Sequence, residues 1–430
     1  MSTALLTDRY ELTMVDAALR DGRALRPSVF ELFARRLPAG RRYGVVAGTG
    51  RLLDLIRDFR FGPDELSFLK QQKVVGAETL DWLEEFRFTG TIRGYREGEI
   101  YFPGSPLLVV EGTFAEACLL ETLALSVLNY DSAVASAAAR MVSAAEGRPL
   151  AEMGSRRTGE RSAVAAARAA YIAGFAASSN LEAGRIWGIP TMGTAAHSFT
   201  LLHDSEKEAF EAQVAALGTG TTLLVDTYDI PQGIATAIEV AGTGLGAIRI
   251  DSGDLGLVVR DARDQLDALG ATGTKITVTN DLDEYAIASL RAAPVNSYGV
   301  GTALVTGSGS PASGMVYKLV AHLDDDGGWL PVGKTSEGKA TVGGRKQPIR
   351  ALKNGVAKSE DIWVEDPPVA ADAGRPLLTD LIVHGEPVAE HLGPDGVAAA
   401  RAHHAMAIGE LPIAAHALSR GEPVLPTNYL

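Results

Sequence analysis

The sequence predicts an α/β protein whose largest part is an irregular α/β barrel, joined to an α+β domain built from the N-terminal and C-terminal segments. Five short apolar runs follow one another between residues 185 and 305, and each run ends in a cluster of polar residues. The runs recur at intervals of roughly 25 to 30 residues, which accommodate a strand, a crossover helix and two short loops. Successive βα units with polar residues at the carboxyl ends of their strands are typical of a barrel active site.

The five runs are the predicted barrel strands. They lie at 185–190, 223–225, 247–250, 276–278 and 297–298, and the polar clusters that end them lie at 193–197, 226–229, 251–254, 279–281 and 299–302. A further strand is predicted at 149–153. It ends at Arg156 and Arg157, and a helix from Ser162 to Ile172 is expected to follow.

The rest of the chain does not show the barrel period. The N-terminal segment predicts a helix at 5–19, two short helices within 66–86, and strands joined by tight turns within 90–112. After residue 315 strand-like alternation returns. The expected domains are 1–115 for an N-terminal α+β domain, 116–314 for the barrel with the active site, and 315–430 for a C-terminal segment that packs on the N-terminal domain.

Composition limits the class of partner. The formal net charge of −13 argues against a nucleic-acid or anionic-membrane partner, because both bind basic surfaces. No run approaches the ~18 apolar residues that a transmembrane helix needs, and residues 1–8 do not resemble a secretory signal, so we expect a cytoplasmic protein. Cys118, the one cysteine, rules out a disulfide framework within the chain and is expected to be a buried core residue.

The most specific local pattern begins with Arg249. It lies in a predicted strand, and Asp251, Ser252, Gly253 and Asp254 follow at the carboxyl end. Carboxylates can accept hydrogen bonds from ribose hydroxyls, a guanidinium can bind a phosphate through two contacts, and a glycine lets the backbone approach a ligand. The pattern predicts a sugar-phosphate site. The alternative is a solvated acidic turn with Arg249 as its ion-pair partner.

Three further groups of candidates follow other predicted strands. Gly301 and Thr302 could cradle a phosphate through backbone N–H groups and a hydroxyl, although the same sequence is common in ordinary turns. Arg156 and Arg157 could bind anions, or could be a solvated charge pair. His197 follows Thr194 in a glycine-threonine turn, where a functional role competes with a structural one.

Residues 328–335 match the letter pattern of a P-loop, Gly-x-x-x-x-Gly-Lys-Thr. An acidic turn precedes them where a buried strand would be needed, and Ser336 to Lys339 follow without an evident helix. We interpret this match as a coincidence.

Taken together, these residues resemble the nicotinate phosphoribosyltransferase family. The blocks that carry the likeness occur in order along most of the chain, at Leu6–Thr13, Gly154–Arg157, Gly193–His197, Asp226–Asp229, Arg249–Asp254, Val300–Thr302 and Lys334–Lys346. The resemblance implies a type II phosphoribosyltransferase-like barrel beside an α+β domain, and homodimers with sites at the subunit interface. It also implies an ATP-dependent ligase of NAD salvage, which makes nicotinate mononucleotide and pyrophosphate from nicotinate and 5-phosphoribosyl-1-pyrophosphate.

The resemblance also implies roles for individual residues. Tyr10 and Thr194 would contact nicotinate, Arg249 and Thr302 would hold the phosphoribosyl part, and His197 would be transiently phosphorylated by ATP. The candidate catalytic residues are therefore His197, Asp251 and Arg249, and the candidate substrate-binding residues are Tyr10, Arg156, Arg157, Thr194, Asp226, Ser252, Gly253, Asp254, Gly301 and Thr302.

Mg²⁺ is expected to arrive on the pyrophosphate, with help from Asp226, Asp251 or Asp254. Three other functions remain open from the sequence. They are nicotinamide phosphoribosyltransferase with an uncharged acceptor, quinolinate phosphoribosyltransferase without ATP, and a barrel-derived binding protein without turnover.

Overall fold

The computed structural model describes residues 2–335, 341–365 and 374–430. They form two compact units. The first combines the chain up to Ser136 with Ser310–Leu430, and the second is Ala137–Gly309. The residues that match the P-loop letter pattern, 328–335, include strand β13, whose three residues are exposed. The residues that follow them, 336–340, lie outside the described part of the chain.

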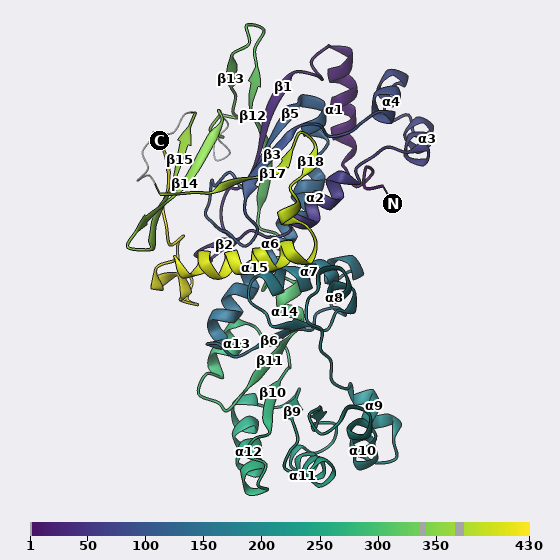
Figure 1. Cartoon of the computed structure of the whole chain (residues 1–430), viewed down its shortest axis with the longest axis vertical. Helices are drawn as coiled ribbons and strands as arrows, with labels where there is room; N and C mark the ends of the chain where they lie inside the picture. The colour runs from purple at the N-terminus through teal and green to yellow at the C-terminus, as the bar shows by residue number, and fades with distance from the viewer. Residues whose placement is uncertain (1, 336–340, 366–373) are drawn as a thin grey trace. The chain divides into compact units, whose positions relative to one another are not determined.

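An antiparallel sheet of seven strands organises the first unit (Figure 1). Strand β1 pairs with β12 on one side and with β5 on the other, so a C-terminal strand lies between β1 and the edge strand β13. This pairing joins the two ends of the chain in one unit. In spatial order the strands are β13 (Trp329–Pro331), β12 (Met315–Leu323), β1 (Pro27–Ala34), β5 (Leu108–Thr113), β3 (Thr91–Tyr95), β17 (Leu378–Val383) and β18 (Glu386–Pro387).

Two smaller sheets complete the strands of this unit. One has two strands, β2 (Gly44–Val45) and β4 (Ile100–Tyr101). The other has the order β16 (Arg375–Pro376), β14 (Lys346–Lys353), β15 (Val356–Val364) and β19 (Thr427–Tyr429). The helices are α1 (Arg9–Arg20), α2 (Thr49–Arg57), α3 (Pro63–Gln71), α4 (Ala77–Glu84), α5 (Phe114–Cys118) and α15 (Gly393–Gly409), with short 3-10 turns at Ala389–His391 and Ile413–His416.

The first unit reaches Ser136 rather than ending at the predicted residue 115. Its core contains Cys118 and, from the first part of α6 (Glu121–Ala145), Leu123 and Val127. The apolar stretch after residue 115 therefore belongs to the core of the N-terminal segment, and α6 continues into the second unit. The other boundary falls at Ser310 rather than at 315.

Six parallel strands form the sheet of the second unit. In spatial order they are β7 (Ala177–Ser178), β6 (Leu150–Glu152), β11 (Ser297–Val300), β10 (Lys275–Val278), β9 (Ala247–Ile250) and β8 (Thr222–Leu224). Strands β7 and β8 are the two edges and do not pair with each other, so the barrel is incomplete. The predicted fold class, an irregular α/β barrel with an α+β domain, is confirmed.

Helices connect these parallel strands, as the predicted βα units require; α12, for example, packs against β10 (Figure 1). They are α7 (Glu160–Ile172), α8 (Leu181–Trp187), α9 (His197–Leu202), α10 (Glu206–Leu217), α11 (Ile230–Ala241), α12 (Leu255–Ala268) and α13 (Glu284–Ser289). The short helix α14 (Thr302–Val305) follows β11, the last of these strands in the chain. Across the described ranges, none of the helices combines the length and the apolar character that crossing a membrane requires.

The strand predicted at 185–190 is wrong, because its first half, 185–187, belongs to helix α8 and the rest is not a strand. The side chain of Asn180 caps the helix by accepting a hydrogen bond from the backbone N–H of Ala183, and Ala183 and Trp187 are buried four residues apart on one helix face. The helix ends where Gly188 takes a left-handed conformation at φ +67°. The strand of this βα unit lies earlier, at Ala177–Ser178.

Candidate functional site

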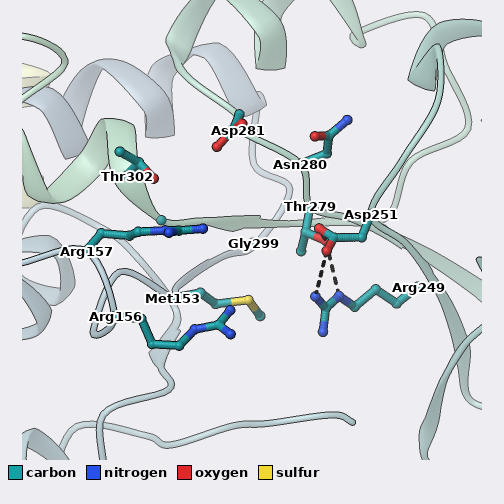
Figure 2. Close-up of a pocket in the computed structure, with 11 residues that line it drawn as sticks. Met153, Arg156, Arg157, Arg249, Asp251, Thr279, Asn280, Asp281, Gly299 and Thr302 are labelled. Carbon is teal, nitrogen blue, oxygen red and sulfur yellow. Dashed lines mark hydrogen bonds and ion pairs between the residues drawn. The ribbon is translucent and has the colours of Figure 1, made fainter. Parts of the chain in front are cut away.

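A cavity of about 200 Å³ lies at the carboxyl ends of β6, β9, β10 and β11 (Figure 2). Because these strands are parallel, the residues at their carboxyl ends gather at one edge of the sheet. The cavity is lined by Met153, Arg156, Arg157, Arg249, Asp251, Thr279, Asn280, Asp281, Gly299, Gly301 and Thr302. Six of these residues were candidates from the sequence, namely Arg156, Arg157, Arg249, Asp251, Gly301 and Thr302.

Arg249 is fixed by polar partners from neighbouring strand ends. Its Nε donates to Thr279 Oγ1 at 3.1 Å, and its Nη1 donates to Thr194 Oγ1 at 2.9 Å. Its Nη2 lies 3.4 Å from Asp251 Oδ2, and Thr279 also donates a hydrogen bond to Asp251. The side chain of Arg249 is 13% exposed. The guanidinium is thus held in one orientation at the wall of the cavity.

Arg156 and Arg157 enter the cavity from the turn after β6, on the side opposite Arg249 (Figure 2). Both residues are exposed. Neither guanidinium makes an ion pair with another residue in the described ranges. Two uncompensated positive charges at the wall of a small polar cavity favour an anionic ligand.

Gly299 leaves room where three strand ends meet. A Cβ at this position would lie 2.6 Å from Thr279 Cγ2 and 2.7 Å from Met153 Sδ, closer than van der Waals contact permits. Gly301 and Thr302 follow at the start of α14, with Thr302 at the cavity wall. The strand end therefore presents backbone and one hydroxyl, rather than bulky side chains, to a ligand.

His197 and Asp226 form a pair at the carboxyl end of β8. His197 Nε2 lies 3.1 Å from Asp226 Oδ1; the histidine side chain is 41% exposed and the aspartate 1%. The second carboxylate oxygen of Asp226 accepts hydrogen bonds from the backbone N–H of Asp251 at 2.8 Å and from Ser252 Oγ at 2.7 Å. Asp226 therefore orients His197 and ties it to the loop after β9, although His197 does not line the cavity.

The remaining predicted residues have other positions. Gly253 adopts a left-handed conformation at φ +82°, and Asp254 caps α12 by accepting a hydrogen bond from the backbone N–H of Gly256. Neither lines the cavity, and Ser252 bonds to Asp226 instead. Tyr10 lies on α1 in the first unit, 45% exposed.

Sequence reasoning did not select Met153, Thr279, Asn280 and Asp281 as site residues, although each directly follows a predicted strand or ends it. Asn280 and Asp281 have positive φ angles of 83° and 45°. Such angles are unfavourable for residues with a Cβ and are concentrated at functional sites. Their position at the end of β10 was the signal that could have identified them.

The described residues contain no group of three or more His, Cys, Asp or Glu side chains that could hold a metal ion. Asp226 already makes hydrogen bonds with His197 and the loop after β9, and Asp254 accepts the hydrogen bond that caps α12. Asp251 and Asp281 are the carboxylates at the cavity wall. This set suits an ion that is carried in by a phosphorylated substrate better than one held by protein ligands alone.

Comparison with known proteins places the chain in a family. The family model for the N-terminal domain of nicotinate phosphoribosyltransferase matches residues 5–129. A nicotinate phosphoribosyltransferase of Mycobacterium tuberculosis is 58% identical over 436 residues, which cover 99% of this chain and 95% of that protein. One from Bacillus subtilis is 37% identical, with coverage of 84% and 76%.

Solved structures agree with this result. The crystal structure of human nicotinic acid phosphoribosyltransferase matches with a TM-score of 0.81 and 27% identity, and the match covers 99% of this chain and 97% of the human one. The sequence matches extend over nearly the whole chain, and so does the structural match. The chain therefore belongs to the nicotinate phosphoribosyltransferase family.

Proposed function

We propose that the chain transfers the phosphoribosyl group of 5-phosphoribosyl-1-pyrophosphate to nicotinate, releasing nicotinate mononucleotide and pyrophosphate, and that ATP hydrolysis is coupled to the transfer. The product would serve NAD salvage. The relatives' names supply the reaction, since those from M. tuberculosis and B. subtilis are both nicotinate phosphoribosyltransferases. The cavity after β6, β9, β10 and β11 supplies a place for it.

The observation that carries this proposal is the presence of Arg156, Arg157 and Arg249 around one cavity in a chain of net charge −13. Guanidinium groups bind phosphates and carboxylates through paired hydrogen bonds. Arg249 is partly neutralised by Asp251, whereas the other two are not. The excess positive charge suits a donor with two phosphorylated ends and an acceptor with a carboxylate.

The transfer breaks the bond between the anomeric carbon of ribose and pyrophosphate, and forms a bond from that carbon to the pyridine nitrogen of nicotinate. The nitrogen lone pair is already nucleophilic, so the reaction needs no general base. Positive charge develops on the ribosyl centre, and the carboxylates of Asp251 and Asp281 can stabilise it or accept hydrogen bonds from ribose hydroxyls. The residues thus position the reactants and stabilise separated charge.

Mg²⁺ would enter with the pyrophosphate group, where it neutralises the charge of the leaving group. Asp251 and Asp281 at the cavity wall are the residues that would contact it, directly or through water. Arg156 and Arg157 would hold the remaining phosphate oxygens or the nicotinate carboxylate. In all these roles the side chains bind and orient, and they exchange no proton.

His197 would accept the phosphoryl group of ATP. Its Nε2 bonds to Asp226, so the proton is expected on Nε2 and the nucleophilic lone pair on Nδ1. The bond from Nδ1 to the γ-phosphorus would form as the bond to the leaving ADP oxygen breaks, and water would later hydrolyse the phosphohistidine. Because Asp226 also holds the loop that begins with Asp251, a charge change at His197 can reach the sugar-phosphate site.

We further propose that Thr194 and Tyr10 contact nicotinate and that the active form is a homodimer with sites at the subunit interface. Thr194 Oγ1 bonds to Arg249, which places it beside the cavity wall. Multi-angle light scattering of the purified chain should give twice the mass of 45.2 kDa. A monomer with full activity would refute the shared site.

The reaction itself is tested by measuring pyrophosphate release with nicotinate and 5-phosphoribosyl-1-pyrophosphate, with and without ATP, and by identifying nicotinate mononucleotide. Nicotinamide and quinolinate serve as alternative acceptors in parallel reactions. We expect turnover with nicotinate and stimulation by ATP. Turnover with nicotinamide but not nicotinate would show that the chain is a nicotinamide phosphoribosyltransferase. Absence of turnover with every acceptor would support a binding protein without catalytic activity.

A further inference from the structure

The turn Gly154–Arg157, which we call the arginine turn, carries both unpaired guanidinium groups of the cavity. Its backbone closes on itself through a 2.8 Å hydrogen bond from the N–H of Arg157 to the carbonyl of Gly154. The rest of its conformation depends on Glu152, Ser178 and Asn180, three residues that do not line the cavity. These three residues have no part in the chemistry described above.

Glu152 lies beneath the turn and is fully buried. One carboxylate oxygen accepts a hydrogen bond from the backbone N–H of Gly154, and the other accepts one from Ser178 Oγ at 2.6 Å. It has no ion pair among the described residues, and burial raises the pKa of its carboxyl group. A buried carboxylate without a cation costs free energy unless it is hydrogen-bonded, so both bonds are needed to keep it in place.

Asn180 continues this chain of hydrogen bonds back to the turn. Its backbone N–H donates to Ser178 Oγ at 2.9 Å, and its side-chain Nδ2 donates to Ser155 Oγ at 3.0 Å. Its Oδ1 accepts from the N–H of Ala183 and caps α8. The arginine turn is therefore hydrogen-bonded at two successive residues, Gly154 and Ser155, by the connected group of Glu152, Ser178 and Asn180.

The turn is also packed closely against α14. A Cβ at Gly154 would lie 2.2 Å from Val305 Cγ1 and 3.2 Å from the carbonyl oxygen of Gly301. The backbone of the turn thus has no free space on that side. Hydrogen bonds to Gly154 and Ser155 and close packing at Gly154 together restrict the turn.

We propose that Glu152, Ser178 and Asn180 are positioning residues that set the arginine turn, and that the hydrogen bond from Asn180 to Ser155 contributes directly to the affinity for the pyrophosphate-bearing substrate. This inference rests on the proposed function, because it assigns the ligand of Arg156 and Arg157. Loss of the bond frees the turn, so that binding must first order it again.

The test uses two variants that remove this bond from opposite ends. Asn180→Ser keeps a neutral oxygen to cap α8 but is too short to reach Ser155, and Ser155→Ala removes the acceptor. Each should raise the KM for 5-phosphoribosyl-1-pyrophosphate about fivefold, the factor expected for one neutral hydrogen bond, and leave kcat within about twofold. The KM of the double variant should be no higher than that of either single variant, because both remove the same bond. Ser155→Thr keeps a hydroxyl and should have the KM of the wild-type chain.

Thermal unfolding and the binding of inorganic pyrophosphate by titration calorimetry complete the test. Pyrophosphate affinity should fall in parallel with the rise in KM, and this readout stands even if the wild-type chain shows no turnover with nicotinate. Ser205→Ala, which removes the cap of α10, is the control for loss of a helix cap and should leave the KM unchanged. Unchanged KM and affinity in Asn180→Ser and Ser155→Ala, or additive effects in the double variant, would overturn the proposal.

Discussion

At the scale of the residue, the site depends on side chains whose partners come from different strand ends. Arg249 is joined to Thr279, which follows β10, and to Thr194, which lies before α9. His197 is joined to Asp226, which follows β8. Each functional group is therefore oriented by residues far away in the sequence. The consequence is that a single substitution should change one part of the reaction without unfolding the chain.

Arg249→Ala should raise the KM for 5-phosphoribosyl-1-pyrophosphate about tenfold to a hundredfold, because a charge-assisted contact to phosphate is lost. Arg249→Lys should recover little of this loss, since the single nitrogen of lysine cannot take the positions of both Nε and Nη1, which bond to Thr279 and Thr194, and has no planar fork for a phosphate. Steady-state kinetics with varied donor concentration check both values. An unchanged KM in Arg249→Ala would move the phosphate site elsewhere.

His197→Ala should abolish ATP hydrolysis stimulated by nicotinate and leave weak transfer that does not depend on ATP. The reason is that the variant lacks the imidazole nucleophile that Asp226 orients. Incubation with ATP labelled at the γ-phosphate should also mark the wild-type chain with an acid-labile label and leave the variant unmarked. His203→Gln, in the residue that follows the same short helix, is the control. Undiminished coupling in His197→Ala would remove His197 from the mechanism.

At the scale of the element, glycines allow strand ends and turns to approach one another. The strand end at β11 has no room for a Cβ at Gly299, and the arginine turn has none at Gly154. The neighbouring groups are the side chains of Thr279 and Met153 in the first case and Val305 in the second. The shape of the cavity therefore depends on contacts between elements as much as on its charged residues.

Gly154→Ala should displace the arginine turn from α14, because the new methyl group would overlap Val305. We expect a stability loss of about 1 to 3 kcal/mol, as for other overpacked sites, and a KM for the donor raised by about tenfold. Gly244→Ala, where nothing lies within 4 Å of the added Cβ, is the matched control. Chemical denaturation and kinetics measure the two effects, and equal behaviour of the two variants would contradict the close contact.

At the scale of the whole molecule, the N-terminal and C-terminal segments of the first unit are joined by buried charges. Glu99, from the N-terminal segment, lies 2.6 Å from Arg375 Nη1 and 2.8 Å from His403 Nε2. Arg350, from the C-terminal segment, is fully buried; its Nη2 lies 3.7 Å from Glu99 Oε1 and donates to the carbonyl of Ile100 at 2.7 Å. Buried pairs of this kind are costly to break one partner at a time, so they bind the two segments into one cooperative unit.

Burial by itself raises the pKa of Glu99, but hydrogen bonds from His403 and Arg375 and the charge of Arg350 outweigh it and lower the pKa from 4.5 to about 2. The stabilising contribution of this carboxylate is therefore present above pH 4.5 and is lost as the pH falls towards 2. By linkage it amounts to about 3 kcal/mol. Thermal unfolding of the wild-type chain should show this loss over that pH window.

Glu99→Gln should lower the melting temperature at neutral pH and remove most of that acid dependence. Asp325→Asn is the control, since Asp325 pairs with Arg26 at the surface and is 93% exposed, and it should change stability by less than about 1 kcal/mol. Parallel pH profiles for wild type and Glu99→Gln would show that Glu99 does not supply the linkage.

The sequence by itself determined five of the six barrel strands and six of the residues that line the cavity. Apolar runs followed by polar clusters identified β6, β8, β9, β10 and β11, because a short buried strand must be apolar and its carboxyl end must be solvated. Arg156, Arg157, Arg249, Asp251, Gly301 and Thr302 were predicted because they follow or end such strands, and they line one cavity.

Tertiary structure alone decided which polar residues act together and where the units divide. The run at 185–190 is as apolar as a strand, yet the cap at Asn180 and the burial of Ala183 and Trp187 make its first half, 185–187, the end of a helix. Hydrogen bonds such as those of Asp226 to His197 and of Asn180 to Ser155 join residues from separate βα units. Such contacts are set by the order of strands in the sheet, which local periodicity does not encode.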